Sequence, residues 1–235
     1  MSSNMKSFVF AFLMCITVGL LLTLASDGLS ERQAANVKTD QQKNILQALG
    51  YMNKSDKWDR EKVNQVYRNT VNDQYISDSG VLSESGMPIH IVRDDTGAIK
   101  QYAVPFKAYG LWSWIYGYIA IEGDATHVAG LSVYKHGETP GLGGECEKPW
   151  FVNQFTGKKI RDNSGDFRSV GIVKGKVEDK IPASQQAYYV DGMSGATITG
   201  DGMARDLRDT LEKYEPFAEN LLESDSLTQV SYYEY

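Results

Sequence analysis

The sequence predicts an α+β domain, an antiparallel sheet with flanking helices, preceded by a single N-terminal transmembrane helix. Three observations lead to this prediction: an apolar run without charges opens the chain, two pairs of strand-like segments flank short turn sequences, and a helix-periodic segment lies near the C-terminus. The composition agrees, because 235 residues with 42% hydrophobic and 23% charged side chains are typical of a globular protein.

The apolar run covers residues 7–26 and contains no charged side chain. A helix of about 20 residues spans roughly 30 Å, the thickness of the hydrocarbon core of a bilayer. A cleaved signal peptide is the alternative, since Thr23–Ala25 has a small-x-small pattern, but the apolar part of a signal peptide is usually only about 7–15 residues long. We therefore predict an uncleaved anchor. Residues 1–6 are expected in the cytoplasm, because Lys6 precedes the run and acidic residues follow it.

The rest of the chain divides into a polar stalk, residues 27–44, and one domain, residues 45–235, that is long enough to bury its own core. Two core-facing helices are predicted to open the domain. The first has an apolar stripe at Ile45, Leu49 and Met52. The second is predicted to begin at Ser55 or Asp56 and to carry Trp58, Val63, Val66 and Tyr67.

Strands are predicted in the middle of the domain, where apolar and polar residues alternate. Two hairpins are expected, one joining 88–93 to 98–104 and one joining 113–122 to 126–134, because Asp94–Gly97 and Gly123-Asp124 are turn sequences. Further strands are predicted at 168–173 and 187–190.

The last predicted helix carries Met203, Leu207, Leu211 and Tyr214 at helical spacing. We expect it to end before Pro216, because proline lacks the N–H that a helix interior needs.

Composition also excludes several classes of protein. The net charge is −6 and the basic residues form no block, which argues against nucleic-acid binding. Two cysteines, Cys15 and Cys146, are too few for a disulfide framework or a CxxC metal site. The three histidines, His90, His127 and His136, lie in different segments, so no metal site is predicted.

The first unusual segment is a glycine-rich loop at residues 135–145, which follows a predicted strand. Four of the eight residues 137–144 are glycine, so the backbone either forms an exposed loop or lets another group approach closely. The sequence matches neither a P-loop nor a dinucleotide-binding fingerprint.

The second unusual segment, residues 191–200, joins a predicted strand to the last helix. Small neighbours leave space around the hydroxyl of Thr197, and Thr199 is predicted to cap the helix. The first N–H groups of that helix favour an anion such as a phosphate. The alternative is that Ser194, Thr197 and Thr199 serve only in capping and packing.

Both segments resemble motifs of a known family. The run Asp191–Thr197, DGMSGAT, resembles the flavinylation motif D-x-x-S/T-G-A-T, and His136–Glu145 resembles the second signature of FMN-binding domains. The chain is similar to the C subunits of the sodium-translocating NADH:quinone reductases over nearly its whole length, including Asn44–Gly50, Gly110–Ser113 and Tyr214–Phe217. The related G subunits of the Rnf ferredoxin:NAD oxidoreductase complexes share the motifs and are the alternative family for this chain. One departure is Gly200, where relatives commonly have serine.

The resemblance implies a membrane-anchored electron-transfer subunit with FMN bound covalently to Thr197 through a phosphoester. It implies a bacterial inner membrane, with the domain in the periplasm, and partner subunits that hold flavins and an iron–sulfur centre and complete the sodium-pumping reaction with NADH and quinone. A separate flavin transferase, using FAD and Mg²⁺, would make the attachment. Asp191, Ser194, Gly195 and Ala196 complete the motif, and Asp191 is interpreted as a recognition element for the transferase.

The same resemblance and the chemistry of flavins suggest further FMN contacts. Trp112 and Leu142 are candidates for contact with the apolar face of the ring system. Glu138 and Thr139 are candidates for hydrogen bonds to it, and Gly141 is a candidate for close approach of the backbone.

Lys174 is a candidate cation for the phosphate or the reduced flavin, and Thr199 lies beside the attachment residue. A core position for Trp112 and a solvated surface position for Lys174 are the alternatives.

Two other functions remain as alternatives for the whole protein: a module that binds an anionic ligand non-covalently, and a purely structural periplasmic domain.

Overall fold

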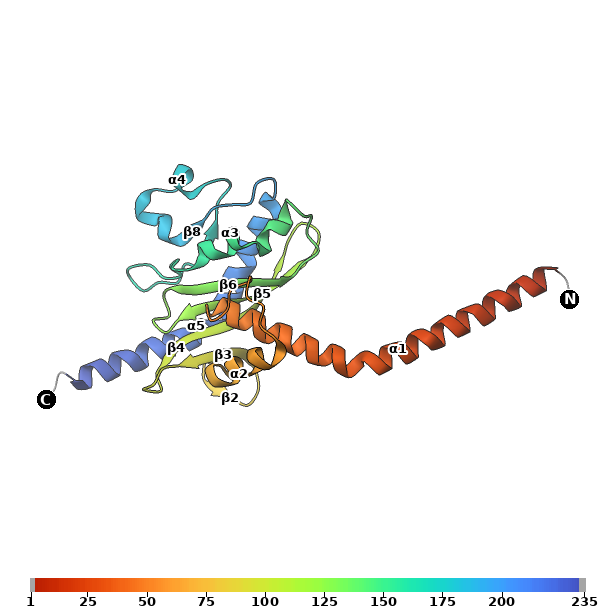
Figure 1. The fold of residues 1–235 in the computed structure, drawn as a ribbon. Helices are drawn as coiled ribbons and strands as arrows, with labels where there is room; N and C mark the ends of the chain where they lie inside the picture. Colours follow the sequence, from red (N-terminus) through yellow and green to blue (C-terminus); the bar gives the residue numbers. More distant parts are fainter. Residues whose placement is uncertain (1–2, 233–235) are drawn as a thin grey trace. The chain divides into compact units, whose positions relative to one another are not determined.

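The computed structural model describes the backbone of residues 3–232 and the side chains of residues 4–223. The chain forms two compact units, Met1–Gln41 and Gln42–Tyr235. Helix α1 (Ser3–Ala48) begins in the first unit and ends in the second, so the predicted stalk, residues 27–44, is helical throughout (Figure 1).

Within the described residues, one helix, Asn4–Ala48, is long and apolar enough to cross a membrane. The hydroxyls in its apolar part bond to the preceding helical turn: Thr17 Oγ1 donates to the Leu13 carbonyl at 2.8 Å, and Thr23 Oγ1 to the Gly19 carbonyl at 2.9 Å. These bonds satisfy both hydroxyls within the helix, which suits a membrane segment.

A six-stranded antiparallel sheet forms the centre of the second unit, with strand order β2-β1-β3-β4-β5-β6. The sequence predicts the antiparallel sheet but not its strands β1 and β2. Its strands are β1 (Asn72–Ile76), β2 (Leu82–Ser83), β3 (Met87–Arg93), β4 (Ile99–Tyr109), β5 (Trp114–Glu122) and β6 (Val128–Lys135). The two predicted hairpins, β3–β4 and β5–β6, are both present.

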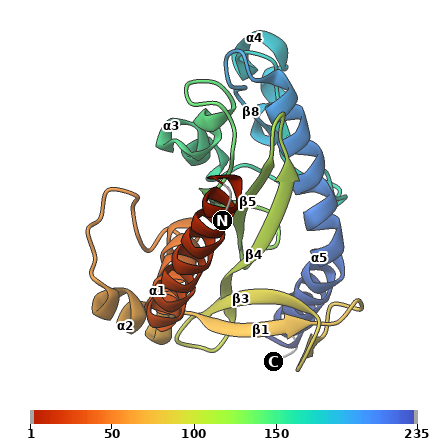
Figure 2. The same cartoon turned by 90° about the vertical axis from the view of Figure 1, so that its right-hand side faces the viewer.

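The two faces of the sheet bury separate apolar clusters. On one face, α2 (Arg60–Thr70) and the end of α1 pack on Val92, Ala103 and Ala120. On the other face, α5 (Thr197–Tyr232) covers the larger cluster, which includes the predicted residues Met203, Leu207, Leu211 and Tyr214. Figure 2 shows α2 and α5 on opposite sides of the sheet.

Several predicted helix boundaries are wrong. Helix α1 ends at Ala48, so Leu49 and Met52 are buried in the turn that follows it instead of lying on a helical stripe. Helix α2 begins later than Ser55 or Asp56, because the side chain of Asp59 accepts a hydrogen bond from the Lys62 N–H and caps it. Helix α5 continues through Pro216 instead of ending before it. Phe217 and Ala218 are buried directly after the proline, so core packing holds the chain helical where the local preference would end it.

The segment between β6 and α5 contains only short elements. They are the 3-10 helix η1 (Gly143–Glu147), α3 (Pro149–Val152), η2 (Asn153–Phe155), β7 (Gly171–Ile172), α4 (Val177–Lys180), η3 (Ala183–Tyr188) and β8 (Tyr189–Val190). The strands predicted at 168–173 and 187–190 are reduced to β7 and β8, which pair in parallel and form a separate two-stranded sheet.

Candidate cofactor site

Thr197 is the first residue of α5 and is exposed. The first helical hydrogen bond runs from the Gly200 N–H to the Ala196 carbonyl at 3.0 Å. The N–H groups of residues 197–199 therefore have no acceptor within the helix, which is the arrangement that favours an anion. Thr197 is thus an exposed residue at this helix end.

The turn before Thr197 is held by a backbone hydrogen bond and by two buried side chains. The Ala196 N–H bonds to the Met193 carbonyl at 3.2 Å, and both of these side chains are buried. Gly195 has a φ of +70°, and a β-carbon there would lie 2.8 Å from Cδ2 of Leu142. Glycine at this position thus allows both the left-handed turn and the close approach of the glycine-rich loop.

Asp191, the first residue of the motif, has a structural role in the fold. Its Oδ1 accepts a hydrogen bond from the Val177 N–H at 2.7 Å, and its own N–H donates to Oε1 of Gln154 at 2.9 Å. The next residue must be glycine, because a β-carbon at Gly192 would lie 2.0 Å from the Val173 carbonyl oxygen.

Glu138 is buried, and its carboxylate accepts hydrogen bonds from three consecutive backbone N–H groups. These donors are Leu111 (3.2 Å), Trp112 (2.8 Å) and Ser113 (3.0 Å) in the loop between β4 and β5. The fourth donor is the hydroxyl of Thr199, at 2.7 Å. Glu138 therefore connects the β4–β5 loop to the start of α5.

These hydrogen bonds differ from the roles that the sequence predicts for Thr199 and Glu138. Thr199 is buried and bonds to Glu138, so it does not cap α5 as predicted. Glu138 already accepts four hydrogen bonds from the protein, so its carboxylate is committed to holding the loop instead of being a free flavin contact. Burial raises the pKa of Glu138, but the hydrogen bonds from Thr199 and the three N–H groups outweigh it and hold that pKa below its usual range.

Two glycines make room for the Glu138 carboxylate. A β-carbon at Gly110 would lie 2.6 Å from its Oε1, and a β-carbon at Gly143 would lie 2.5 Å from its Oε2 and 2.7 Å from Oγ1 of Thr199.

Gly141, in contrast, has open space around it and a φ of +75°. Glycine is therefore favoured there by the left-handed backbone and not by a close contact. Thr139 is exposed, and its carbonyl accepts the N–H groups of Leu142 and Gly144 at 3.1 and 2.9 Å.

Exposed apolar side chains come from the elements around Thr197. Trp112 is 67% exposed, Ile198 60%, and Leu142 44%, so Trp112 is not a core residue. Leu142 lies against Gly195, while the Trp112 backbone is bonded to Glu138. Apolar side chains that remain this exposed on adjoining loops typically mark a binding surface.

Lys174 lines the same small pocket as Thr197, together with Ile172 and Gly200. It is exposed and forms an ion pair with Asp201, Nζ to Oδ2, at 3.6 Å. The fold thus brings together the lysine and the threonine that sequence analysis selected. Gly200, where relatives commonly have serine, is buried, and a β-carbon there would lie 3.3 Å from Cγ2 of Ile172.

Cys146 is buried, and burial raises the pKa of its thiol to about 12. Among the residues that the structure describes, no group of three or more His, Cys, Asp or Glu side chains is placed to hold a metal ion.

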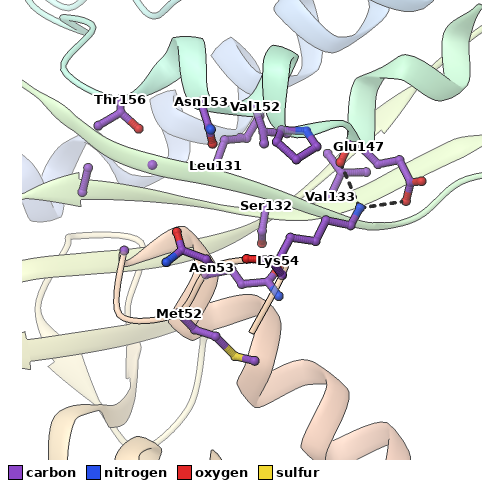
Figure 3. A pocket seen from close by; sticks show the side chains of 16 residues that line it. Met52, Asn53, Lys54, Leu131, Ser132, Val133, Glu147, Val152, Asn153 and Thr156 are labelled. Atoms are coloured by element: carbon purple, nitrogen blue, oxygen red, sulfur yellow. Dashed lines mark hydrogen bonds and ion pairs between the residues drawn. The ribbon is translucent and has the colours of Figure 1, made fainter. Parts of the chain in front are cut away.

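A pocket of about 460 Å³ lies elsewhere, along strand β6 (Figure 3). Lys54 crosses it and bonds to Glu147, from Nζ to the carbonyl oxygen at 3.0 Å and to Oε2 at 3.3 Å. Its lining mixes amides, hydroxyls and aliphatic side chains, and it contains none of the predicted site residues.

Comparisons with known proteins show which family the chain resembles. The family model of the FMN-binding domain matches residues 110–212, which include both the glycine-rich loop and the start of α5. The C subunit of the Na(+)-translocating NADH-quinone reductase from Yersinia pestis is 29% identical over 233 residues, 84% of this chain and 85% of that protein. The crystal structure of the corresponding C subunit from Parabacteroides distasonis has 30% identity and a TM-score of 0.70, and the match covers 81% of this chain and 96% of that one.

The chain belongs to the family of C subunits of the Na⁺-translocating NADH:quinone reductases. NqrC from Shewanella oneidensis is a further structural match, with 26% identity, a TM-score of 0.66, and coverage of 79% and 98% of the two chains. The predicted resemblance and the predicted α+β fold are therefore confirmed. As a member of this family, the chain is an FMN-binding, electron-transfer component of a multi-subunit oxidoreductase.

Sequence analysis missed the exposed apolar positions Leu111 and Ile198, which are 46% and 60% exposed. In sequence they look like core residues, and only the fold places them at the surface. It also missed the structural role of Glu138, although an acidic residue within a glycine-rich loop was a usable signal, because glycines often surround a group that needs space.

Proposed function

We propose that this NqrC-family protein carries FMN on the hydroxyl of Thr197 through a phosphoester and serves as a one-electron relay. The observation that carries the proposal is the position of Thr197, exposed at the first residue of a long helix. Of the three hydroxyls in the motif, Thr199 is buried and bonded to Glu138, and Ser194 precedes the helix. Among them, Thr197 alone combines accessibility with the free N–H groups of the helix end.

The residues around Thr197 fit FMN in both charge and polarity. The N–H groups at the start of α5 stabilise a phosphoester anion by roughly 0.3–1 kcal/mol, and more if it is partly buried. Lys174 supplies a cation to the same pocket, where it is paired with Asp201. Trp112, Leu142 and Ile198 offer an apolar surface for the ring system. When bound, FMN supplies the redox chemistry, which side chains alone do not provide.

Each residue of the site has a defined task in this proposal. The Thr197 oxygen holds the phosphate, while Gly195 keeps the turn open and brings Leu142 close. Glu138 fixes the loop that carries Trp112 relative to α5. Thr139 and Gly141 belong to the exposed part of the glycine-rich loop and are proposed as further contacts.

We propose that a flavin transferase attaches the group from FAD in the presence of Mg²⁺. The Thr197 hydroxyl would lose its proton to a base of the transferase, and its oxygen would form a bond to the phosphorus on the FMN side of FAD. The diphosphate bond would break, and AMP would leave. Asp191 and Ser194 are proposed recognition residues for that enzyme. Because Asp191 also holds the Val177 N–H, its substitution is expected to loosen the adjoining loop as well.

The proposed location is the periplasmic side of a bacterial inner membrane. The apolar part of α1, residues 7–26, is proposed to stay as the anchor in contact with lipid, with residues 1–6 in the cytoplasm. The stalk would cover residues 27–44 and the FMN-binding domain residues 45–235. Other subunits that hold flavins and an iron–sulfur centre are the proposed electron partners.

Absorbance of the acid-precipitated protein tests the proposal. The full chain is produced together with a flavin transferase, precipitated, and washed. Flavin absorbance that stays with the pellet supports covalent attachment. Flavin released into the supernatant would indicate non-covalent binding, and a chain without flavin would indicate a structural domain; either result contradicts the proposal.

A further inference from the structure

A second hollow on α5 has no part in the proposed flavin function. It has a volume of about 420 Å³ and lies between α5 and the segment that leads into β7. Its lining includes Arg168, Arg205 and Arg208, together with Ser169 and Tyr188, and contains no acidic residue. The lining is therefore cationic, although the net charge of the chain is −6.

The arginines keep hydrogen-bonding capacity. Nε of Arg205 bonds to Oδ1 of Asp206 at 2.7 Å, and Nε of Arg208 bonds to Oε1 of Glu212 at 3.0 Å. Each carboxylate thus fixes one edge of a guanidinium, and the terminal amino groups remain for another acceptor. The guanidinium carbon of Arg168 lies 5.0 Å from the centre of the Tyr188 ring, a cation–π contact.

Ser169 supplies a second, independent observation. It is only 5% exposed, its hydroxyl has no hydrogen-bond partner, and its φ is +63°. A left-handed backbone is uncommon for serine, and an unsatisfied buried hydroxyl lowers stability. Strained backbone and unpaired polar groups of this kind concentrate where a protein binds a ligand.

We propose that the hollow formed by Arg168, Ser169, Tyr188, Arg205 and Arg208, here called the arginine pocket, binds an oxyanion of the phosphate class. Guanidinium groups match the paired oxygens of phosphate, and several guanidinium groups together suit a multiply charged group. A hydroxyl adds one more donor. The hollow has room for more than a bare phosphate, so the proposed ligand is a phosphate ester or diphosphate, either soluble or the headgroup of an anionic phospholipid. This inference depends neither on Thr197 nor on the flavin.

Pyrophosphate binding to the full chain tests the soluble source. The chain is kept in a non-ionic detergent without phosphate, and binding is measured by calorimetry and by the shift of the unfolding temperature, at constant ionic strength. We expect saturable binding and a higher Tm, because a ligand that binds only the folded state stabilises it. Arg205→Gln and Arg208→Gln should each raise the dissociation constant about tenfold, because each removes charge-assisted hydrogen bonds.

Ser169→Gly separates a binding role from a structural one. Glycine adopts a φ of +63° readily and removes the unsatisfied hydroxyl, so the free energy of unfolding should not fall. The affinity for pyrophosphate should nevertheless decrease. Opposite effects on stability and affinity are not expected of a residue that serves packing alone.

Two controls locate the bound anion. Arg68→Gln removes an exposed arginine of α2 and should leave the affinity unchanged. Lys174→Gln removes the cation beside Thr197 and reports any anion that binds at the start of α5 instead. A loss of binding in Lys174→Gln, with none in the arginine-pocket variants, would place the anion at the start of α5 and overturn the proposal.

Reconstituted vesicles test the lipid source. The full chain is placed in vesicles of phosphatidylglycerol or of phosphatidylcholine, and amide hydrogen exchange of residues 167–171 and 204–208 is compared. Slower exchange only with phosphatidylglycerol, lost in Arg205→Gln, identifies a lipid headgroup as the ligand. If neither pyrophosphate nor phosphatidylglycerol acts on the wild-type chain through these arginines, the arginine pocket is not an oxyanion site.

Discussion

The hydroxyl of Thr199 donates a hydrogen bond of 2.7 Å to Oε2 of Glu138, although 61 positions separate the two residues in sequence. The same carboxylate receives the backbone N–H groups of residues 111–113. A single buried charge therefore holds together the three segments around Thr197: the β4–β5 loop, the glycine-rich loop and the start of α5.

Replacing Thr199 by valine should destabilise the domain by roughly 1.5–3 kcal/mol, the range for a hydrogen bond to a charged group. Valine has nearly the shape of threonine but cannot donate, so Glu138 loses one of its four partners. Thr199→Ser keeps the donor and should lose much less stability. Urea unfolding of the chain made without flavin transferase measures both. Equal losses in the two variants would contradict the importance of the hydrogen bond.

Glu138 should make stability depend on pH in the acid range. Its pKa is held below the usual range in the folded domain, so the unfolded chain binds more protons there. Its contribution is complete above the unfolded glutamate pKa, about 4.3, and is lost as the pH falls through the lower folded pKa. The difference in free energy of unfolding between wild type and Glu138→Gln should therefore shrink on acidification.

Urea unfolding between about pH 6 and pH 3 measures this difference. Glu84→Gln, at an exposed position, is the control and should give a curve parallel to that of the wild type. Parallel curves for Glu138→Gln as well would show that the ionised carboxylate does not contribute as described.

Thr197→Ala should abolish covalent flavin completely, because no other hydroxyl of the motif is both accessible and at the helix end. Ser194→Ala should lower the loading without eliminating it, and Thr199→Ala should keep attachment with reduced stability. The measurement is flavin fluorescence of the denatured chain in a gel, after production with a flavin transferase. Fluorescence retained in Thr197→Ala, or a flavin-bearing peptide modified at another residue, would assign the attachment elsewhere.

Two glycines of the loop should respond differently to alanine. A β-carbon at Gly143 would lie 2.5 Å from Oε2 of Glu138, so Gly143→Ala should displace the carboxylate and destabilise the domain by more than about 1–2 kcal/mol. Gly141 has open space and a φ of +75°, so Gly141→Ala should cost only about the 1–2 kcal/mol of a left-handed non-glycine residue. Thermal unfolding compares them, and a larger loss at Gly141 would contradict this account.

The parts of the fold that depend on local sequence were predictable. The turn at Asp94–Gly97 contains its own hydrogen bonds, including one from the Thr96 N–H to Oδ1 of Asp94, so the β3–β4 hairpin is encoded within a few residues. Strand β1 was not predicted, because four of its five residues are exposed and it lacks an alternating pattern. The continuation of α5 past Pro216 depends on core packing that local rules do not describe.

The local structure around the proposed site was predictable in part. The motif selected Thr197 between a strand and a helix, but the predicted cap Thr199 set the start of that helix after Thr197, whereas α5 begins at Thr197. The partner of Thr199 was not predictable, because Glu138 lies in another loop and only the folded sheet brings them together. The arginine pocket also depends on distant segments, since Arg168 precedes β7 and Arg205 lies within α5.

Because Cys146 is buried, its reaction with a thiol reagent can report local unfolding of the domain. Its thiol is fully buried, and a pKa of about 12 leaves almost none of it as the reactive thiolate at neutral pH. The other described cysteine, Cys15, lies in the apolar part of α1. The rate at which an alkylating reagent modifies Cys146 therefore measures how often the segment next to the glycine-rich loop unfolds, without any introduced label.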